Sequence, residues 1–84
     1  MADVIIYSKA NCPYCVHAKN LLTEKGVDFD ELRIDLDPVA FAAMQEIVPN
    51  ARTVPQIVIK GAPVGGFDDL KAINDAGKLD ELLS

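Results

Sequence analysis

The chain has 84 residues, of which 50% are hydrophobic and 25% are charged, and its formal net charge is −5. This balance of apolar and charged residues excludes an intrinsically disordered chain, and the length leaves room for one hydrophobic core. We therefore expect a single domain over residues 1–84 that folds without stabilising disulfides.

The negative charge is concentrated in one segment. Residues 27–50 contain six acidic residues against one arginine, a net charge of −5, and we expect this stretch to be solvated surface rather than a docking face. An acidic protein repels phosphate backbones, so nucleic-acid binding is not expected. Apolar runs such as residues 4–7 are far shorter than the roughly 18 residues of a membrane helix, and no signal peptide is visible. The expected location is cytoplasmic, away from membranes.

The first half of the chain predicts a strand, a helix and a second strand. Residues 4–7 are β-branched or aromatic, which is typical of a buried strand. A helix is predicted from Cys12 onward, because Pro13 suits a first helical turn and Gly26 suits a C-terminal stop. Residues 29–34 alternate too weakly to define a buried face, but their position after a helix predicts a strand parallel to the first. These elements form a right-handed β-α-β unit.

The second half predicts a helix, a hairpin and a last helix. Asp37 is a suitable N-cap with Pro38 at the first helical position. Residues 56–60 and 62–64 are predicted as two short strands of a hairpin, and residues 67–76 as the last helix. The expected order is therefore β-α-β-α-β-β-α. Apolar residues follow at helical spacing in the second helix and just after it: Phe41, Met44, Ile47 and Val48. Met44 is expected to be a core residue and not a ligand.

Cys12 and Cys15 form a Cys-x-x-Cys motif after the first predicted strand. This spacing brings two sulfurs within bonding reach, and in a β-α-β setting it is typical of a redox site. Unpaired N–H groups and the positive dipole end of a helix favour a thiolate, so Cys12 is the predicted nucleophile. Cys15, one turn deeper, is expected to be less ionised and to attack a mixed disulfide at Cys12. The loop is too short for a strongly stabilising disulfide, which indicates a reducing compartment.

The residues alone leave other roles open. The cysteines are alternatively inert core residues or half of a metal site, for which the chain offers His17 and no third cysteine. Lys9 either stabilises the thiolate, meets a substrate carboxylate, or is an ordinary solvated lysine. Tyr14, expected to be exposed, either contacts a substrate or covers the helix surface.

Three segments resemble, in this order, the dithiol glutaredoxin family: Cys12-Pro13-Tyr14-Cys15, Thr53-Val54-Pro55-Gln56 and Gly65-Gly66-Phe67-Asp68-Asp69-Leu70. The likeness covers essentially the whole chain, and both ends are similar to bacterial members. It implies an α/β thioredoxin fold, with a four-stranded mixed sheet flanked by three or more helices and a cis Pro55. Val54 would then present its backbone N–H and C=O to an extended peptide; without the family, this segment is an ordinary strand entry.

The resemblance also implies a glutathione site. Gly65 and Gly66 would let the backbone approach the ligand, and Asp68 with nearby helix N–H groups would hold the charged ends of the γ-glutamyl group. Without the family, this segment is a turn with a helix cap. Arg52 and Gln56 would meet the glycine carboxylate, unless Arg52 is simply a surface arginine. The residues assigned to glutathione are Lys9, Tyr14, Arg52, Thr53, Val54, Pro55, Gly66, Phe67 and Asp68.

The implied activity is that of an enzyme, a glutathione-dependent thiol-disulfide oxidoreductase acting on protein-glutathione mixed disulfides and protein disulfides. Glutathione would be the electron-donating co-substrate, regenerated by glutathione reductase, and neither a tightly bound cofactor nor a metal is expected. One alternative is an iron-sulfur cluster carrier in which two chains each supply Cys12, against which Pro13 argues. Another is a redoxin reduced by thioredoxin reductase. A monomer suits exchange chemistry.

Overall fold

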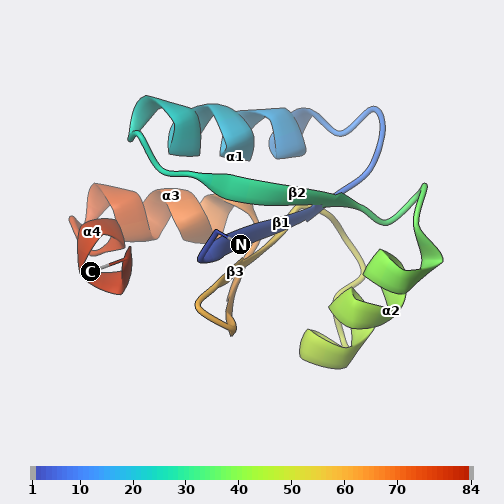
Figure 1. Cartoon of the computed structure of the whole chain (residues 1–84). Helices are drawn as coiled ribbons and strands as arrows, with labels where there is room; N and C mark the ends of the chain where they lie inside the picture. Colours follow the sequence, from blue (N-terminus) through green and yellow to red (C-terminus); the bar gives the residue numbers. More distant parts are fainter. Residues whose placement is uncertain (1, 84) are drawn as a thin grey trace.

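A four-stranded mixed sheet organises the computed structural model, which describes residues 2–83 (Figure 1). The strands are β1 (Val4–Ser8), β2 (Phe29–Arg33), β3 (Gln56–Ile59) and β4 (Ala62–Gly65). Their order in the sheet is β2-β1-β3-β4. The β1 and β2 strands are parallel, whereas β3 is antiparallel to both of its neighbours. The predicted parallel strand and hairpin are therefore confirmed.

The helices lie on both faces of the sheet. They are α1 (Pro13–Glu24), α2 (Pro38–Ile47), α3 (Phe67–Asp75) and α4 (Leu79–Leu83). The α1 and α3 helices cover one face and α2 covers the other (Figure 1). The predicted element order omits α4, which has only five residues and therefore no readable periodicity. Its Leu79 is buried against the core formed with α1 and α3.

The two cores follow the alternation of side chains along the strands. Val4 and Ile6 pack under α1 and α3, whereas Tyr7 packs with Met44 of α2. Successive side chains of a strand point to opposite faces, so one sheet supplies both cores. Met44 is buried, which confirms the prediction for it, whereas 41% of the surface of Phe41 is exposed. A pattern at helical spacing marks an apolar stripe, and Phe41 lies at its solvent edge.

Caps at the helix N-termini match the sequence signals. Pro13 begins α1 with Cys12 as its N-cap, and the Asp37 carboxylate caps α2 by accepting a 2.9 Å hydrogen bond from the Val39 N–H. Pro38 begins α2, where its missing N–H leaves no hydrogen bond unmade. Among residues 2–83, no helix combines the length and apolar composition needed to cross a membrane.

The acidic segment differs from a simple solvated surface, because four of its carboxylates have specific partners. The Asp30 carboxylate accepts from the Ala2 N–H, and that of Asp37 caps α2. The Glu31 carboxylate binds Ser8 and Lys19, whereas Asp35 binds Arg33 and the Ala10 N–H. These contacts connect β2 and the following loop to β1 and α1, so part of the negative charge holds the fold together.

Candidate redox active site

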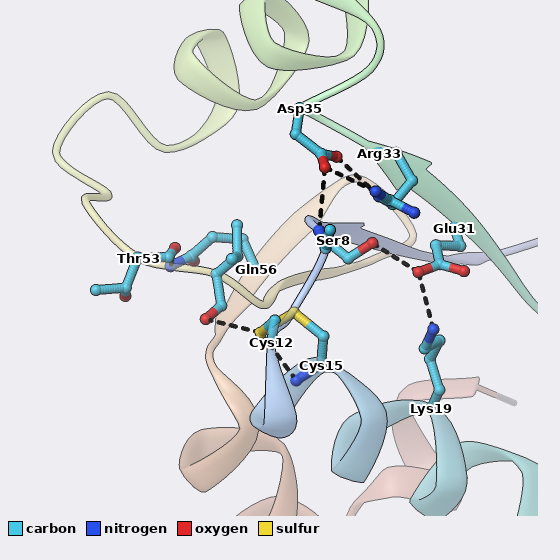
Figure 2. The surroundings of a disulfide bond; sticks show 11 residues. Ser8, Cys12, Cys15, Lys19, Glu31, Arg33, Asp35, Thr53 and Gln56 are labelled. Atoms are coloured by element: carbon cyan, nitrogen blue, oxygen red, sulfur yellow. Dashed lines mark hydrogen bonds and ion pairs between the residues drawn. A yellow bond between two sulfur atoms is a disulfide. The ribbon is translucent and has the colours of Figure 1, made fainter.

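Cys12 and Cys15 are joined by a disulfide at the N-terminus of α1 (Figure 2). Their Cα atoms are 5.2 Å apart, as one helical turn allows. Cys12 is partly exposed, whereas only 2% of the Cys15 surface is accessible. The predicted difference in burial between the two cysteines is confirmed, and Cys12 is the sulfur that a bulky partner can reach.

The Cys12 sulfur lies between a backbone donor and a backbone acceptor. The Cys15 N–H donates a 3.1 Å hydrogen bond to the Cys12 Sγ, and the Val54 carbonyl oxygen lies 3.6 Å from the same atom. Once the disulfide is reduced, the N–H group and the helix dipole favour negative charge on this sulfur. The Val54 oxygen offers an acceptor to a thiol proton. The peptide bond from Val54 to Pro55 is cis, as the family resemblance implied.

A groove of about 450 Å³ runs beside this pair, between the loop before β3 and the turn after β4. We call it the glycine-turn groove. Residues that the sequence assigned to glutathione make up most of its lining: Tyr14, Thr53, Val54, Pro55, Gly66, Phe67 and Asp68. These residues come from α1, from the segment before β3 and from the start of α3. The fold thus brings together residues that are up to 54 positions apart in the sequence.

Lys9 and Arg52 lie outside the glycine-turn groove. Both line a separate hollow of about 190 Å³, which we call the Arg52 hollow. This hollow shares Thr53 and Val54 with the groove, so the two cations stand on the other side of the same backbone segment. The assigned residues therefore line two adjoining hollows, and the two cations lie at the smaller one.

Three further residues line the groove: Gln56, Gly65 and Asp69. The family resemblance gave Gln56 a role at the glycine carboxylate and Gly65 one in the close approach of the backbone, whereas it gave Asp69 none. The Gln56 amide nitrogen donates a 2.9 Å hydrogen bond to the Thr53 carbonyl oxygen, so this group braces the loop instead of facing a carboxylate. Asp69 stands at the third helical position, where an acidic residue is the sequence signal for a side chain that reaches back to the N-cap backbone. That signal was present in the second acidic residue of the Asp68-Asp69 pair.

A third hollow, of about 550 Å³, opens on the other side of the cysteines and includes Cys12, Cys15, Lys19 and Glu31 in its lining. The buried Ser8 hydroxyl donates a 2.7 Å hydrogen bond to the Glu31 carboxylate, and the Lys19 ammonium donates another at 3.0 Å (Figure 2). The Ser8 hydrogen bond is the main cause that lowers the pKa of Glu31, with Lys19 adding to it. Glu31 is therefore ionised at neutral pH.

Arg33 and Asp35 form a second charged pair near the cysteine loop. The Arg33 guanidinium donates two 2.7 Å hydrogen bonds to Asp35, which holds the pKa of that carboxyl well below its usual range. Asp35 also accepts from the Ala10 N–H at 3.1 Å. The pair therefore anchors the loop that leads to Cys12.

Aromatic side chains border the glycine-turn groove. The rings of Tyr14 and Phe67 are stacked at 6.1 Å between centroids, and His17 lies within 6 Å of both. Tyr14 is 58% exposed, as predicted. Within residues 2–83 no group of three or more His, Cys, Asp or Glu side chains is placed to hold a metal ion.

The sequence model of the Glutaredoxin family matches residues 4–64. The chain belongs to the glutaredoxin family. Glutaredoxin from Pseudomonas aeruginosa is 51% identical over 84 residues, which cover 100% of this chain and 99% of the relative. Glutaredoxin 3 from Escherichia coli K12 is 48% identical over 85 aligned positions, covering 99% of each chain. Together with the Cys12 and Cys15 pair, this membership identifies a thiol-disulfide oxidoreductase.

The fold agrees with that of solved glutaredoxins. The crystal structure of a buckwheat glutaredoxin-glutathione complex superposes with a TM-score of 0.85 at 28% identity, covering 98% of this chain and 76% of that one. The α/β thioredoxin fold expected from the three motifs is therefore confirmed. Its mixed sheet and its helices on both faces place the N-termini of α1 and α3 beside the cis Pro55.

Proposed function

We propose that this glutaredoxin uses glutathione to reduce protein-glutathione mixed disulfides and protein disulfides, with Cys12 as nucleophile and Cys15 as resolving cysteine. The observation that carries the proposal is the glycine-turn groove, whose Val54 carbonyl lies 3.6 Å from the Cys12 sulfur. A ligand that lies along this backbone segment brings its own sulfur to Cys12. The family relationship and the buckwheat complex with glutathione support the same ligand.

The glycine-turn groove and the Arg52 hollow match the charges of glutathione, a tripeptide with two carboxylates and one ammonium. At one end, the first-turn N–H groups of Phe67 and Asp68 have no intrahelical acceptor and suit the γ-glutamyl carboxylate, while the Asp68 carboxylate suits its ammonium. At the other end, Lys9 and Arg52 in the Arg52 hollow suit the glycine carboxylate. The backbone of Val54 would bind the cysteinyl residue between them. These local positive fields offset the repulsion between an anionic ligand and a chain of net charge −5.

Reduction of a protein-glutathione mixed disulfide needs only Cys12. Its thiolate attacks the glutathione sulfur and forms a new bond to it, and the protein thiolate leaves with the electron pair of the broken bond. A second glutathione thiolate then attacks the glutathione sulfur held on Cys12. This step releases oxidised glutathione and restores the Cys12 thiolate, so one glutathione thiol is oxidised for each protein thiol released, and the other half of the oxidised glutathione is the unit that the protein carried.

Reduction of a protein disulfide uses both cysteines. Cys12 forms a mixed disulfide with the protein, and the Cys15 thiolate attacks the Cys12 sulfur, which releases the reduced protein and leaves the disulfide seen in Figure 2. One glutathione thiolate then bonds to Cys12 and frees Cys15, and a second removes the first as oxidised glutathione. The partners are thus glutathione and disulfide-bearing proteins, with glutathione reductase acting indirectly, and we propose a monomeric cytoplasmic domain with no bound cofactor.

A coupled assay tests the proposal. Purified protein, a glutathionylated peptide, glutathione and glutathione reductase are combined, and NADPH oxidation is followed; a parallel reaction replaces glutathione and its reductase by thioredoxin reductase. We expect turnover in the first reaction and little above background in the second. Turnover only with thioredoxin reductase would overturn the assignment of glutathione as the electron donor.

A further inference from the structure

We propose that Asp69 is a positioning residue for glutathione: its carboxylate holds the Gly65 and Gly66 turn so that the first N–H groups of α3 face the groove. The proposal rests on the function proposed above and assigns no direct ligand contact to Asp69. It separates the roles of two adjacent acidic residues, with Asp68 available to the ligand and Asp69 engaged by its own backbone.

The first observation is a hydrogen bond that closes the turn. The Gly66 N–H donates to the Asp69 carboxylate at 3.1 Å, so a side chain at the third helical position satisfies the N-cap backbone. The ligand therefore does not compete for the Gly66 N–H. The N–H groups left for a carboxylate are those of the following first-turn residues.

The second observation is the shape of the turn at Gly65. Its φ is +121°, a backbone conformation that side chains other than glycine rarely adopt. A Cβ at this position would collide with the Asp69 carboxylate. The carboxylate thus occupies the space that a side chain at Gly65 would take, and the two residues are matched to one another. Gly66 differs, since its φ is −89° and a Cβ there would lie 3.6 Å from the Pro55 carbonyl oxygen.

The third observation is the anchoring of the helix that carries Asp69. Leu70, the next residue, is fully buried in the core with α1, so the start of α3 is fixed relative to the sheet. The turn before it is partly exposed: Gly65 pairs with β3, and the Gly66 N–H is bound by the Asp69 carboxylate. Asp69 lines the same groove as Gly66 and Asp68, and its hydrogen bond connects the anchored start of α3 to the Gly66 backbone.

If charge repulsion alone mattered, removing the Asp69 carboxylate would strengthen glutathione binding, which is the opposite of what the proposal predicts. A second carboxylate beside the groove repels the γ-glutamyl carboxylate, so its loss would strengthen binding if repulsion were its main effect. If the hydrogen bond to Gly66 dominates, its loss weakens binding because the turn no longer holds the N–H groups in place. The two effects are separated by asparagine, which removes the charge and keeps an oxygen acceptor.

The experiment compares Asp69→Ala, Asp69→Asn and wild type in the glutathione-coupled assay with a glutathionylated peptide. We expect Asp69→Ala to raise the KM for the peptide roughly fivefold to tenfold, in line with the loss of a helix-capping hydrogen bond, and kcat to change less than about twofold. Asp69→Asn should stay within about twofold of wild type. Asp75→Ala removes a carboxylate from the last turn of the same helix, away from the groove, and should leave both constants unchanged.

As a control for folding, thermal unfolding of every variant is recorded, and the kinetics are measured at a temperature at which all variants are folded. Gly65→Ala perturbs the same contact with both carboxylates present, so it tests the proposal if Asp69→Ala does not fold; we expect it to raise KM as well. Two results would overturn the role of Asp69, provided that the wild type turns over with glutathione. One is an unchanged KM in Asp69→Ala, and the other is an equal increase in KM in the alanine and asparagine variants. Absence of wild-type turnover with glutathione would instead overturn the proposed function.

Discussion

Two helix N-termini meet at the candidate site, and they are capped in different ways. At α1 the cap is the Cys12 sulfur itself, which accepts a hydrogen bond from the Cys15 N–H. At α3 the N-cap is Gly66, which has no side chain, and Asp69 reaches back from the third helical position. The atom that caps α1 is thus the proposed reacting atom, whereas the cap of α3 leaves the next N–H groups open to a ligand.

The surroundings of the two helix N-termini are also anchored differently. Around the cysteines, the buried Ser8 hydroxyl and the Lys19 ammonium both bind the Glu31 carboxylate, which connects β1, β2 and α1. At the glycine turn, the exposed hydrogen bond from the Gly66 N–H to Asp69 is the side-chain contact, beside the backbone pairing of the turn with β3 and a hydrogen bond from an α3 N–H to the Gly66 carbonyl. The cysteine end is thus held by two side-chain contacts to Glu31 and the glycine turn by one side-chain contact to Asp69. Each prediction below tests one side of this comparison.

The largest expected effect comes from replacing the capping sulfur. Cys12→Ser should lower reduction of a glutathionylated peptide by on the order of 10³-fold or more, because a serine hydroxyl is not ionised and forms no disulfide. Cys15→Ser should keep activity of the same order as wild type with this substrate, since Cys12 alone completes that cycle. The measurement is the coupled NADPH assay. Equal losses in both variants would contradict the assignment of Cys12 as nucleophile.

The next effect separates the two glycines of the turn. Gly65→Ala should destabilise the fold by roughly 1–3 kcal/mol, because alanine disfavours a φ of +121° and its Cβ collides with Asp69. Gly66→Ala should be neutral or stabilising by about 0.4–1 kcal/mol, since its φ of −89° suits alanine. Urea unfolding of both variants measures the difference. Similar destabilisation by both substitutions would show that Asp69 does not distinguish the two positions.

The smallest effect concerns the polar contacts on the cysteine side. The lowered pKa of Glu31 means that its carboxylate stabilises the fold above the pKa of an unfolded glutamate and loses this contribution as pH falls through the lower folded value. Glu31→Gln should therefore reduce the free energy of unfolding at pH 7 by less than about 1 kcal/mol, as its ion pair is partly exposed. The difference from wild type should shrink below roughly pH 4.3. Unfolding curves from pH 7 to 3 provide the check, and a difference that does not depend on pH would contradict the role of the ionised form.

Sequence signals were most informative where the physics is local. Each of the first two helix starts is indicated by two adjacent residues, Cys12 with Pro13 and Asp37 with Pro38. In the structure α1 begins at Pro13 and α2 at Pro38. The α4 helix was missed because five residues give no period, and its position depends on Leu79 entering the core. Helical spacing correctly indicated that Met44 is buried, but it defines an apolar stripe without its edges and so does not show that Phe41 is exposed.

The sequence by itself determined the chemistry of this protein: a cysteine pair at a helix start, a proline segment, and a glycine turn before a helix. Tertiary structure decided how these parts meet. It divided the assigned residues between the glycine-turn groove and the Arg52 hollow, and it joined Ser8 to Glu31 across 23 positions. Caps and turns depend on residues that are close in the sequence. Contacts between distant segments depend on the register of the whole sheet, which local residue types do not specify.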